Sequence, residues 1–303
     1  MPTVHHTLSG VIVPVITPVD DQDRVDEITF RRVIRRLINA GVHGLFVGGS
    51  GGEGPLLASR EWQRMIEIAY DENDDAVALL GGVVDTSTQR VKERIAILAD
   101  VGYGYYVLTP TFYIPLKVND EYLRLFSECH DAAPGMSLVA YNIPQFTNSE
   151  IPIEVVVDLC RRKLITYCKE SSANLSYFQR LISAGAPHGL KVFMGDEANM
   201  SAGLRAGACG IVPGSANVEP WTFIHQFEAA QRQDWDEVAR LQERIMLLRA
   251  NLPLAGSNWI AGIKYGVASL GIGTGRPVSP LQPLSDEQKR KVDAFCAAEV
   301  RKG

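Results

Sequence analysis

Residues 11–18 read VIVPVITP, and the chain then continues into the polar segment DDQDR at residues 20–24. The apolar part of this stretch has the length and the β-branched composition of a buried strand. A doubly wound sheet that binds a dinucleotide would place a G-x-G-x-x-G fingerprint directly after this first strand. No such fingerprint follows here, so the segment favours the other common parallel architecture, a closed (β/α)8 barrel.

Apolar segments of strand length recur along the chain, and amphipathic segments of helical length separate them. The expected strands are residues 11–16, 44–47, 77–80, 105–108, 138–141, 164–168, 191–194 and 210–212. The expected helices between them are residues 27–40, 60–70, 89–99, 120–130, 153–161, 175–183 and 198–206. This alternation predicts an α/β protein with a (β/α)8 TIM barrel.

The pattern becomes purely helical after Pro220. Helical segments are expected at residues 221–230, 235–250, 259–269 and 286–300. We therefore expect residues 1–219 to form the barrel and residues 220–303 to form a C-terminal helical appendage. The appendage should pack on the barrel, so that the chain is a single structural unit.

The composition is that of an ordinary globular protein, because 46% of the 303 residues are hydrophobic and 21% are charged. A net charge of -5 without a long basic run argues against nucleic acid or an anionic membrane as a partner. No stretch approaches the length of a membrane span, and the first residues lack a basic segment followed by an apolar core. We expect a cytoplasmic protein that acts on a small molecule.

Cysteine and histidine spacing gives no metal signature. The five cysteines are scattered and never spaced C-x-x-C, and the six histidines show no H-E-x-x-H pattern. The sequence therefore predicts neither a disulfide framework nor a metal site, and no cofactor.

The lysines differ in their expected place on the barrel. Reactive side chains of such barrels project from the C-terminal ends of the strands, and Lys169 alone follows the end of an expected strand. Lys163 and Lys191 fall at strand starts. A partly desolvated amine at the position of Lys169 can attack a carbonyl. The alternative is a lysine whose ammonium extends from the strand end into solvent.

The segment GGSGGEG, residues 48–54, follows the second expected strand. Its backbone N–H groups can converge on an anion, and Ser50 adds a hydroxyl, so the loop would suit a carboxylate or a phosphate. The alternative is a turn whose glycines serve only its backbone dihedral angles.

Tyr141 ends the fifth expected strand and begins the segment YNIP. A tyrosine at a strand end can relay protons beside an amine. The alternative is a core aromatic whose hydroxyl is hydrogen-bonded.

With the glycine-rich loop, the YNIP segment and Lys169 following one another in this order, the chain resembles the dihydrodipicolinate synthase / N-acetylneuraminate lyase family. The resemblance covers nearly the full length, including GVIVPVITP at residues 10–18, GDE at 195–197 and GIVPGSAN at 210–217. It implies a Schiff base at Lys169, a proton-shuttling phenol at Tyr141 and a pyruvyl carboxylate held at Ser50 and Gly51. Val212 would line the pyruvyl group through its backbone. A protonated imine is an electron sink, so either carbon–carbon cleavage or loss of water becomes feasible.

The resemblance also implies an assembly, because family members are commonly tetramers built from tight dimers. The loop with Phe112 and Tyr113 would lie near the dimer contact. We therefore expect a homotetramer, organised as a dimer of dimers.

Three positions depart from the family's synthases. Those proteins carry a second hydroxyl residue where this chain has Gly51, and a tyrosine that crosses the dimer interface where this chain has Phe112, although Tyr113 could substitute for it. They also place a carboxylate-binding arginine where this chain has Phe146. The GSGGE motif at residues 49–53 is more similar to that of the 2-keto-3-deoxy-sugar-acid aldolases of the family. The apolar Phe146 and Phe112 would equally suit a less polar substrate, as in its aromatic hydratase-aldolases.

The leading hypothesis is therefore a cofactor-free lyase that uses Lys169, Tyr141 and Ser50 and forms pyruvate from a 2-keto-3-deoxy acid. A dehydratase, a hydratase-aldolase or a dihydrodipicolinate synthase-like condensation would use the same imine. A catalytically silent barrel that binds a keto acid is an alternative of another class. A phosphate-binding barrel enzyme is a further one, although such barrels usually bind phosphate after strands seven and eight, and this loop follows strand two.

Overall fold

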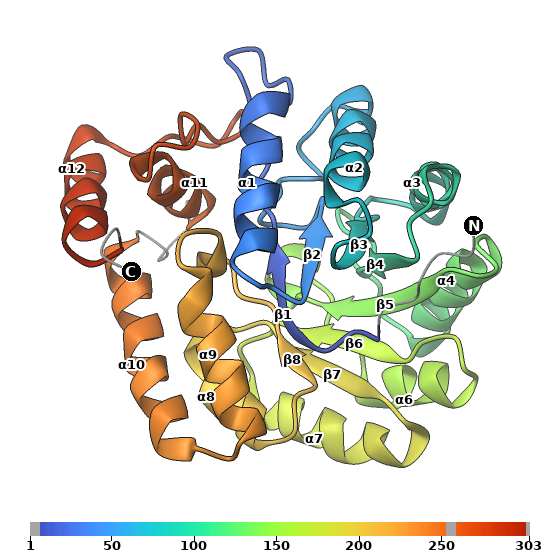
Figure 1. The fold of residues 1–303 in the computed structure, drawn as a ribbon. Coiled ribbons are helices and arrows are strands. Elements are labelled where there is room, and N and C mark those ends of the chain that lie inside the picture. The colour runs from blue at the N-terminus through green and yellow to red at the C-terminus, as the bar shows by residue number, and fades with distance from the viewer. Residues whose placement is uncertain (1–6, 253–258, 301–303) are drawn as a thin grey trace.

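The structure is a computed structural model that describes residues 7–252 and 259–300. Its centre is a closed barrel of parallel strands, in which each strand pairs with the next and β8 pairs with β1 (Figure 1). The strands are β1 Gly10–Pro14, β2 Gly44–Val47, β3 Ala78–Gly82, β4 Tyr105–Leu108, β5 Ser137–Asn142, β6 Tyr167–Glu170, β7 Lys191–Met194 and β8 Gly210–Ile211. The predicted (β/α)8 barrel is confirmed.

Helices connect the strands and continue the chain after β8. They are α1 Glu27–Asn39, α2 Ser59–Asn73, α3 Thr88–Val101, α4 Asn119–Asp131, α5 Pro144–Thr147, α6 Ile153–Arg161, α7 Leu175–Gly185, α8 Met200–Arg205, α9 Pro220–Gln231, α10 Trp235–Asn251, α11 Trp259–Ser269 and α12 Asp286–Phe295. Helix α1 shows why these segments fold as they do. Asp26 caps it by accepting from the Thr29 N–H, and its apolar residues, spaced three and four apart, face the strands.

Alternation of side chains along each strand divides the core in two. One layer fills the barrel and includes Phe46, Tyr141 and Tyr167. The other lies between strands and helices and includes Cys168. Because Tyr167 points inward and Cys168 outward, the next residue, Lys169, points into the barrel.

The helices after β8 differ in what they cover. Helix α9 contacts both β1 and β8 and thereby covers the seam where the barrel closes. Helix α10 packs along α9, and α11 and α12 follow it towards the carboxyl ends of the strands (Figure 1). We propose that the helices added to the barrel begin with α10, so that α9 serves as the eighth barrel helix.

Several strand ends differ from the sequence-based expectation by one to three residues, and those of β1 and β6 bear on the site. Strand β1 ends at Pro14 rather than at residue 16, because the Ile16 N–H donates to Asn217 Oδ1 instead of to a neighbouring strand. Strand β6 begins three residues later than expected and includes Lys169, which therefore lies within the strand rather than after it. Lys163, with φ of +62°, belongs to the turn before this strand.

Candidate active site

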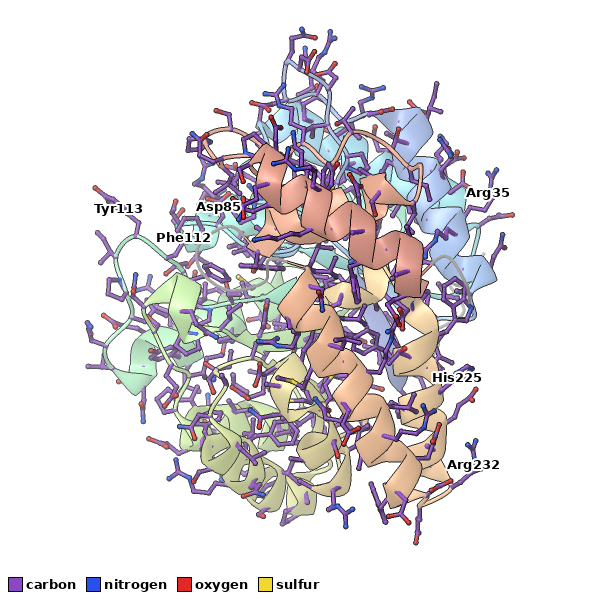
Figure 2. All side chains as sticks on the ribbon, turned by 90° about the vertical axis from the view of Figure 1, so that its left-hand side faces the viewer. Arg35, Asp85, Phe112, Tyr113, His225 and Arg232 are labelled. Carbon is purple, nitrogen blue, oxygen red and sulfur yellow. The ribbon has the colours of Figure 1, made fainter. Side chains whose placement is uncertain are left out.

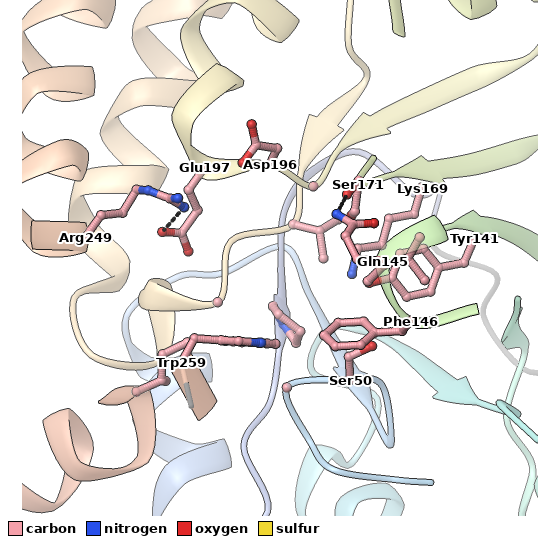
Figure 3. A pocket seen from close by; sticks show the side chains of 17 residues that line it. Ser50, Tyr141, Gln145, Phe146, Lys169, Ser171, Asp196, Glu197, Arg249 and Trp259 are labelled. Atoms are coloured by element: carbon pink, nitrogen blue, oxygen red, sulfur yellow. Dashed lines mark hydrogen bonds and ion pairs between the residues drawn. The ribbon is translucent and has the colours of Figure 1, made fainter. Parts of the chain in front are cut away.

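A cavity of about 440 Å³ opens at the carboxyl ends of the strands (Figure 3). Its lining combines the loops after several strands with two helices of the C-terminal part. The residues are Pro14, Ser50, Gly51, Tyr141, Ile143, Gln145, Phe146, Lys169, Ser171, Gly195, Asp196, Glu197, Val212, Gly214, Arg249, Trp259 and Ile263.

Lys169 lies at the bottom of the cavity and is 7% exposed. Its Nζ lies 4.0 Å from the centroid of the Tyr141 ring and 5.0 Å from that of Phe46. No carboxylate of the described residues lies within ion-pair distance of this amine. The lysine is therefore held by aromatic faces and is not committed to an anionic partner.

The loop of residues 48–54 contributes Ser50 and Gly51 to the lining of the cavity (Figure 3). Gly48 has φ of +73°, and a Cβ on Gly54 would lie 2.0 Å from the Gly48 carbonyl oxygen, so both positions require glycine. The backbone N–H groups of Ser50 and Gly51 donate to none of the residues that the structure describes. The Ser50 hydroxyl is likewise without a partner there. These groups are available to a bound anion.

The far side of the cavity is polar. The Ser171 hydroxyl is buried without a hydrogen-bond partner, and a Cβ on Gly195 would lie only 1.9 Å from its oxygen. Glu197 accepts from both the N–H and the hydroxyl of Ser215. Arg249 Nη1 lies 3.7 Å from Glu197 Oε2, which is outside hydrogen-bonding distance (Figure 3). This side therefore offers a free hydroxyl and a loosely held guanidinium.

A second, mostly apolar cavity of about 270 Å³ adjoins the first. The two share Ser50, Ile143, Phe146 and Trp259. Its other lining residues are Glu53, Pro55, Leu56, Val84, Thr109, Phe112, Thr147, Ile260 and Leu281. The Thr109 hydroxyl is buried there without a partner.

The residues singled out from the sequence lie in three places. Ser50, Gly51, Tyr141, Phe146, Lys169 and Val212 line the first cavity, which is the grouping expected from their strand ends. Phe112 lines the second cavity instead. Tyr113 is 85% exposed and projects from its loop away from the barrel (Figure 2). Tyr113 therefore lines neither of these two cavities in its own chain.

An ion pair beneath the site was missed in the sequence. Glu53 of the glycine-rich loop and Lys264 of α11 are both almost fully buried, and Lys264 Nζ lies 2.6 Å from Glu53 Oε2. The available signal was a single lysine within the otherwise apolar segment 259–269. Its partner lies 211 residues away in the sequence, so spacing could not have identified it.

The described part of the chain contains no helix that is long and apolar enough to cross a membrane. Among the same residues, no three histidine, cysteine, aspartate or glutamate side chains gather where they could hold a metal ion.

Comparison with known proteins defines the family. The model of the dihydrodipicolinate synthetase family matches residues 7–299. The chain belongs to this family. It is 29% identical to 4-hydroxy-tetrahydrodipicolinate synthase of Natronomonas pharaonis, with 95% of this chain and 97% of that protein covered. It is 28% identical to N-acetylneuraminate lyase 2 of Escherichia coli O6:H1, with coverages of 92% and 90%.

Solved structures of the dihydrodipicolinate synthetase family share the fold. Dihydrodipicolinate synthase from Bacteroides thetaiotaomicron superimposes with a TM-score of 0.90 at 28% identity, covering 96% of this chain and 98% of that one. Since the named relatives are lyases and synthases, this member of the dihydrodipicolinate synthetase family is an enzyme of that type.

Proposed function

We propose that this protein is a Schiff-base lyase, of the class I aldolase type, that holds pyruvate as the covalently bound half of a 2-keto acid. The observation that carries the proposal is the buried Lys169 amine, which faces the cavity without an anionic partner beside the Tyr141 ring. An amine held in this way is suited to attack a carbonyl, whereas an ion-paired lysine is not.

The first step forms the imine. Neutral Lys169 Nζ adds to the C2 carbonyl of the keto acid, and the resulting carbinolamine loses water to give an iminium ion. We assign the exchange of protons with the carbinolamine oxygen to Tyr141, whose ring centroid lies 4.0 Å from Nζ.

The second step cleaves the carbon–carbon bond of a 2-keto-4-hydroxy acid. The C4 hydroxyl gives its proton to a base, the C3–C4 bond breaks, and its electron pair moves into the iminium to form an enamine. The aldehyde leaves, C3 of the enamine takes up a proton, and water hydrolyses the imine to release pyruvate. We assign the proton transfers to Tyr141.

The glycine-rich loop supports binding of the substrate carboxylate. The N–H groups of Ser50 and Gly51 and the Ser50 hydroxyl have no partner among the described residues, and both residues line the same cavity as Lys169. Three donors converging on one carboxylate would orient C2 towards the amine. Val212, which is buried at the cavity wall, would limit the space beside the pyruvyl methyl group.

The polar side of the cavity favours a hydroxylated aldehyde half, as in a 2-keto-3-deoxy acid. The Ser171 hydroxyl, the Asp196 carboxylate and the Arg249 guanidinium could each bond a substrate hydroxyl or a terminal acid group. A relative with a similar sequence is named as a lyase of N-acetylneuraminate, which is consistent with a substrate of this kind.

One observation favours a second candidate. The apolar cavity lined by Phe112 and Phe146 adjoins the first at Ser50, so a hydratase-aldolase acting on an aryl or alkyl aldehyde would also find room. Release of pyruvate from a panel of 2-keto-3-deoxy sugar acids, compared with aryl 2-keto acids, separates the two. Turnover of the sugar acids alone supports the leading proposal, and turnover of aryl substrates alone would replace it.

We further propose that the protein is a cytoplasmic homotetramer, as its resemblance to the family implies. The loop with Tyr113 and Ile114 is highly exposed and apolar, which suits a subunit contact. Sedimentation of the purified protein measures the assembly, and a monomer would contradict it.

A further inference from the structure

The side chains of Glu53 and Lys264 are shielded from solvent, although Glu53 also contributes to the lining of the second cavity. Side-chain exposure is 0% for Glu53 and 1% for Lys264. The second carboxylate oxygen, Oε1, accepts from the Val278 N–H at 2.7 Å. Both carboxylate oxygens are thus used, and the pair faces neither solvent nor the amine of Lys169.

Such a pair is an unusual way to fill a core. Burial raises the pKa of Glu53 and lowers that of Lys264, so each charge is disfavoured by its surroundings and retained through its partner. Apolar residues of similar volume often fill such a space with equal or greater stability. The pair therefore calls for a role other than stability.

The backbone of Glu53 adds a second peculiarity. Its φ is +57°, a conformation that glycine adopts easily and a side chain does not. Every other residue of the loop 48–54 except Ser50 is glycine. A glutamate at this position is retained against the backbone preference, which indicates that its side chain is needed.

The pair joins two walls of the active-site cavity. On one side, the Glu53 N–H donates to the Ser50 carbonyl at 3.1 Å and so closes the turn that carries the Ser50 hydroxyl. On the other side, Lys264 belongs to α11, which also places Trp259 and Ile263 in the cavity lining. A shift at the ion pair would move the wall with Ser50 relative to the wall with Trp259.

We propose that Glu53 and Lys264 are positioning residues that hold Ser50 at its working distance from Lys169. The inference rests on the proposed function, in which Ser50 binds the pyruvyl carboxylate. The pair touches no substrate and acts only through the glycine-rich loop. Loss of the pair should therefore weaken the binding of pyruvate before imine formation, in the same way as loss of the Ser50 hydroxyl.

The experiment measures how the rate of borohydride-trapped adduct formation depends on pyruvate concentration. The variants are Glu53→Gln/Lys264→Met, which removes both charges together, Ser50→Ala, and the triple variant. The control is Glu219→Gln/Arg244→Met, which removes a pair of equal 2.6 Å length between α10 and the residue before α9, where neither partner lines the cavity.

We expect the Glu53/Lys264 double variant to need about tenfold more pyruvate for half-maximal adduct formation. The control pair should leave this concentration unchanged. In the triple variant the effects should not add, because both changes remove the same contact. A double variant with unaltered pyruvate dependence, or fully additive effects with Ser50→Ala, would overturn the proposal.

Two further outcomes are distinguishable. If the natural protein forms no pyruvate adduct, the proposed function itself fails, whatever the variants do. If the double variant does not fold, Glu53→Asp decides the question. That variant keeps the carboxylate charge but shortens the side chain by one methylene group. We expect it to raise the half-maximal pyruvate concentration, and an unchanged value would contradict the inference.

Discussion

Lys169 and Tyr141 are register partners on the neighbouring parallel strands β6 and β5, and the amine lies 4.0 Å from the centroid of the phenol ring. Adjacent parallel strands turn the side chains of paired residues to the same face. The contact is therefore a consequence of the barrel register. It places the proposed nucleophile and the proposed proton carrier together in one cavity.

Replacing Tyr141 by phenylalanine separates the two contributions of this residue. The ring face beside Lys169 is retained and only the hydroxyl is lost, so the fold should be preserved. We expect the pyruvate adduct to form still, but turnover to fall about 100-fold, in the range of a single general acid–base group. Steady-state release of pyruvate measures the effect. Wild-type turnover in the variant would remove Tyr141 from the proton transfers.

The glycines of the loop should differ sharply in their tolerance of a side chain. A Cβ on Gly51 would lie 3.4 Å from the Pro14 carbonyl oxygen, which is ordinary contact, whereas one on Gly54 would lie 2.0 Å from that of Gly48. Gly51→Ser is therefore expected to fold normally and to retain adduct formation. Gly54→Ala should lose at least about 1–3 kcal/mol of unfolding free energy. Urea unfolding of both variants provides the comparison, and equal losses would contradict the loop geometry.

Glu170 should make stability depend on pH. This carboxyl points away from the cavity, and burial raises its pKa above the ordinary value of 4.5 in spite of hydrogen bonds from Ser172 and Asn142. Its contribution to stability is then fully present below pH 4.5 and is lost as the pH rises through the raised native value. Relative to Glu170→Gln, the natural protein should become less stable from pH 4.5 towards neutrality. A difference in unfolding free energy that is constant over this range would contradict the assignment.

Arg249 should affect binding of the aldehyde that condenses with pyruvate in the reverse reaction, and it should leave pyruvate binding unaltered. Its guanidinium lies on the polar side of the cavity, 3.7 Å from Glu197. For an aldehyde with a terminal acid group, Arg249→Met should raise the KM for that aldehyde by at least about tenfold, since a charge-assisted hydrogen bond is lost. Arg240→Met, on the exposed face of the same helix, is the matched control. Equal KM values in the two variants would place the aldehyde elsewhere.

Much of the fold follows from local sequence patterns. The strand and helix periods predicted the barrel, because each strand–helix unit carries its own apolar alternation. The start of β6 was misplaced by three residues, since Leu164 and Ile165 are apolar but follow a left-handed turn at Lys163. Hydropathy alone does not register such a turn.

The site was predictable only where strand ends determine it. Ser50, Tyr141 and Lys169 converge because parallel strands of a barrel end at one face. The Glu53–Lys264 pair depends on how α11 packs beneath the glycine-rich loop, and the free Ser171 hydroxyl depends on the close approach of Gly195. Both are tertiary contacts that leave no spacing in the sequence.

The central claim concerns which lysine becomes covalently modified, and the described residues include two buried lysines, Lys169 of β6 and Lys264 of α11. The decisive measurement is peptide mapping by mass spectrometry after reduction of the protein with borohydride in saturating pyruvate. We predict a single reduced adduct on Lys169, absent in Lys169→Ala. An adduct on Lys264 or another lysine, or no adduct at all, would contradict the account.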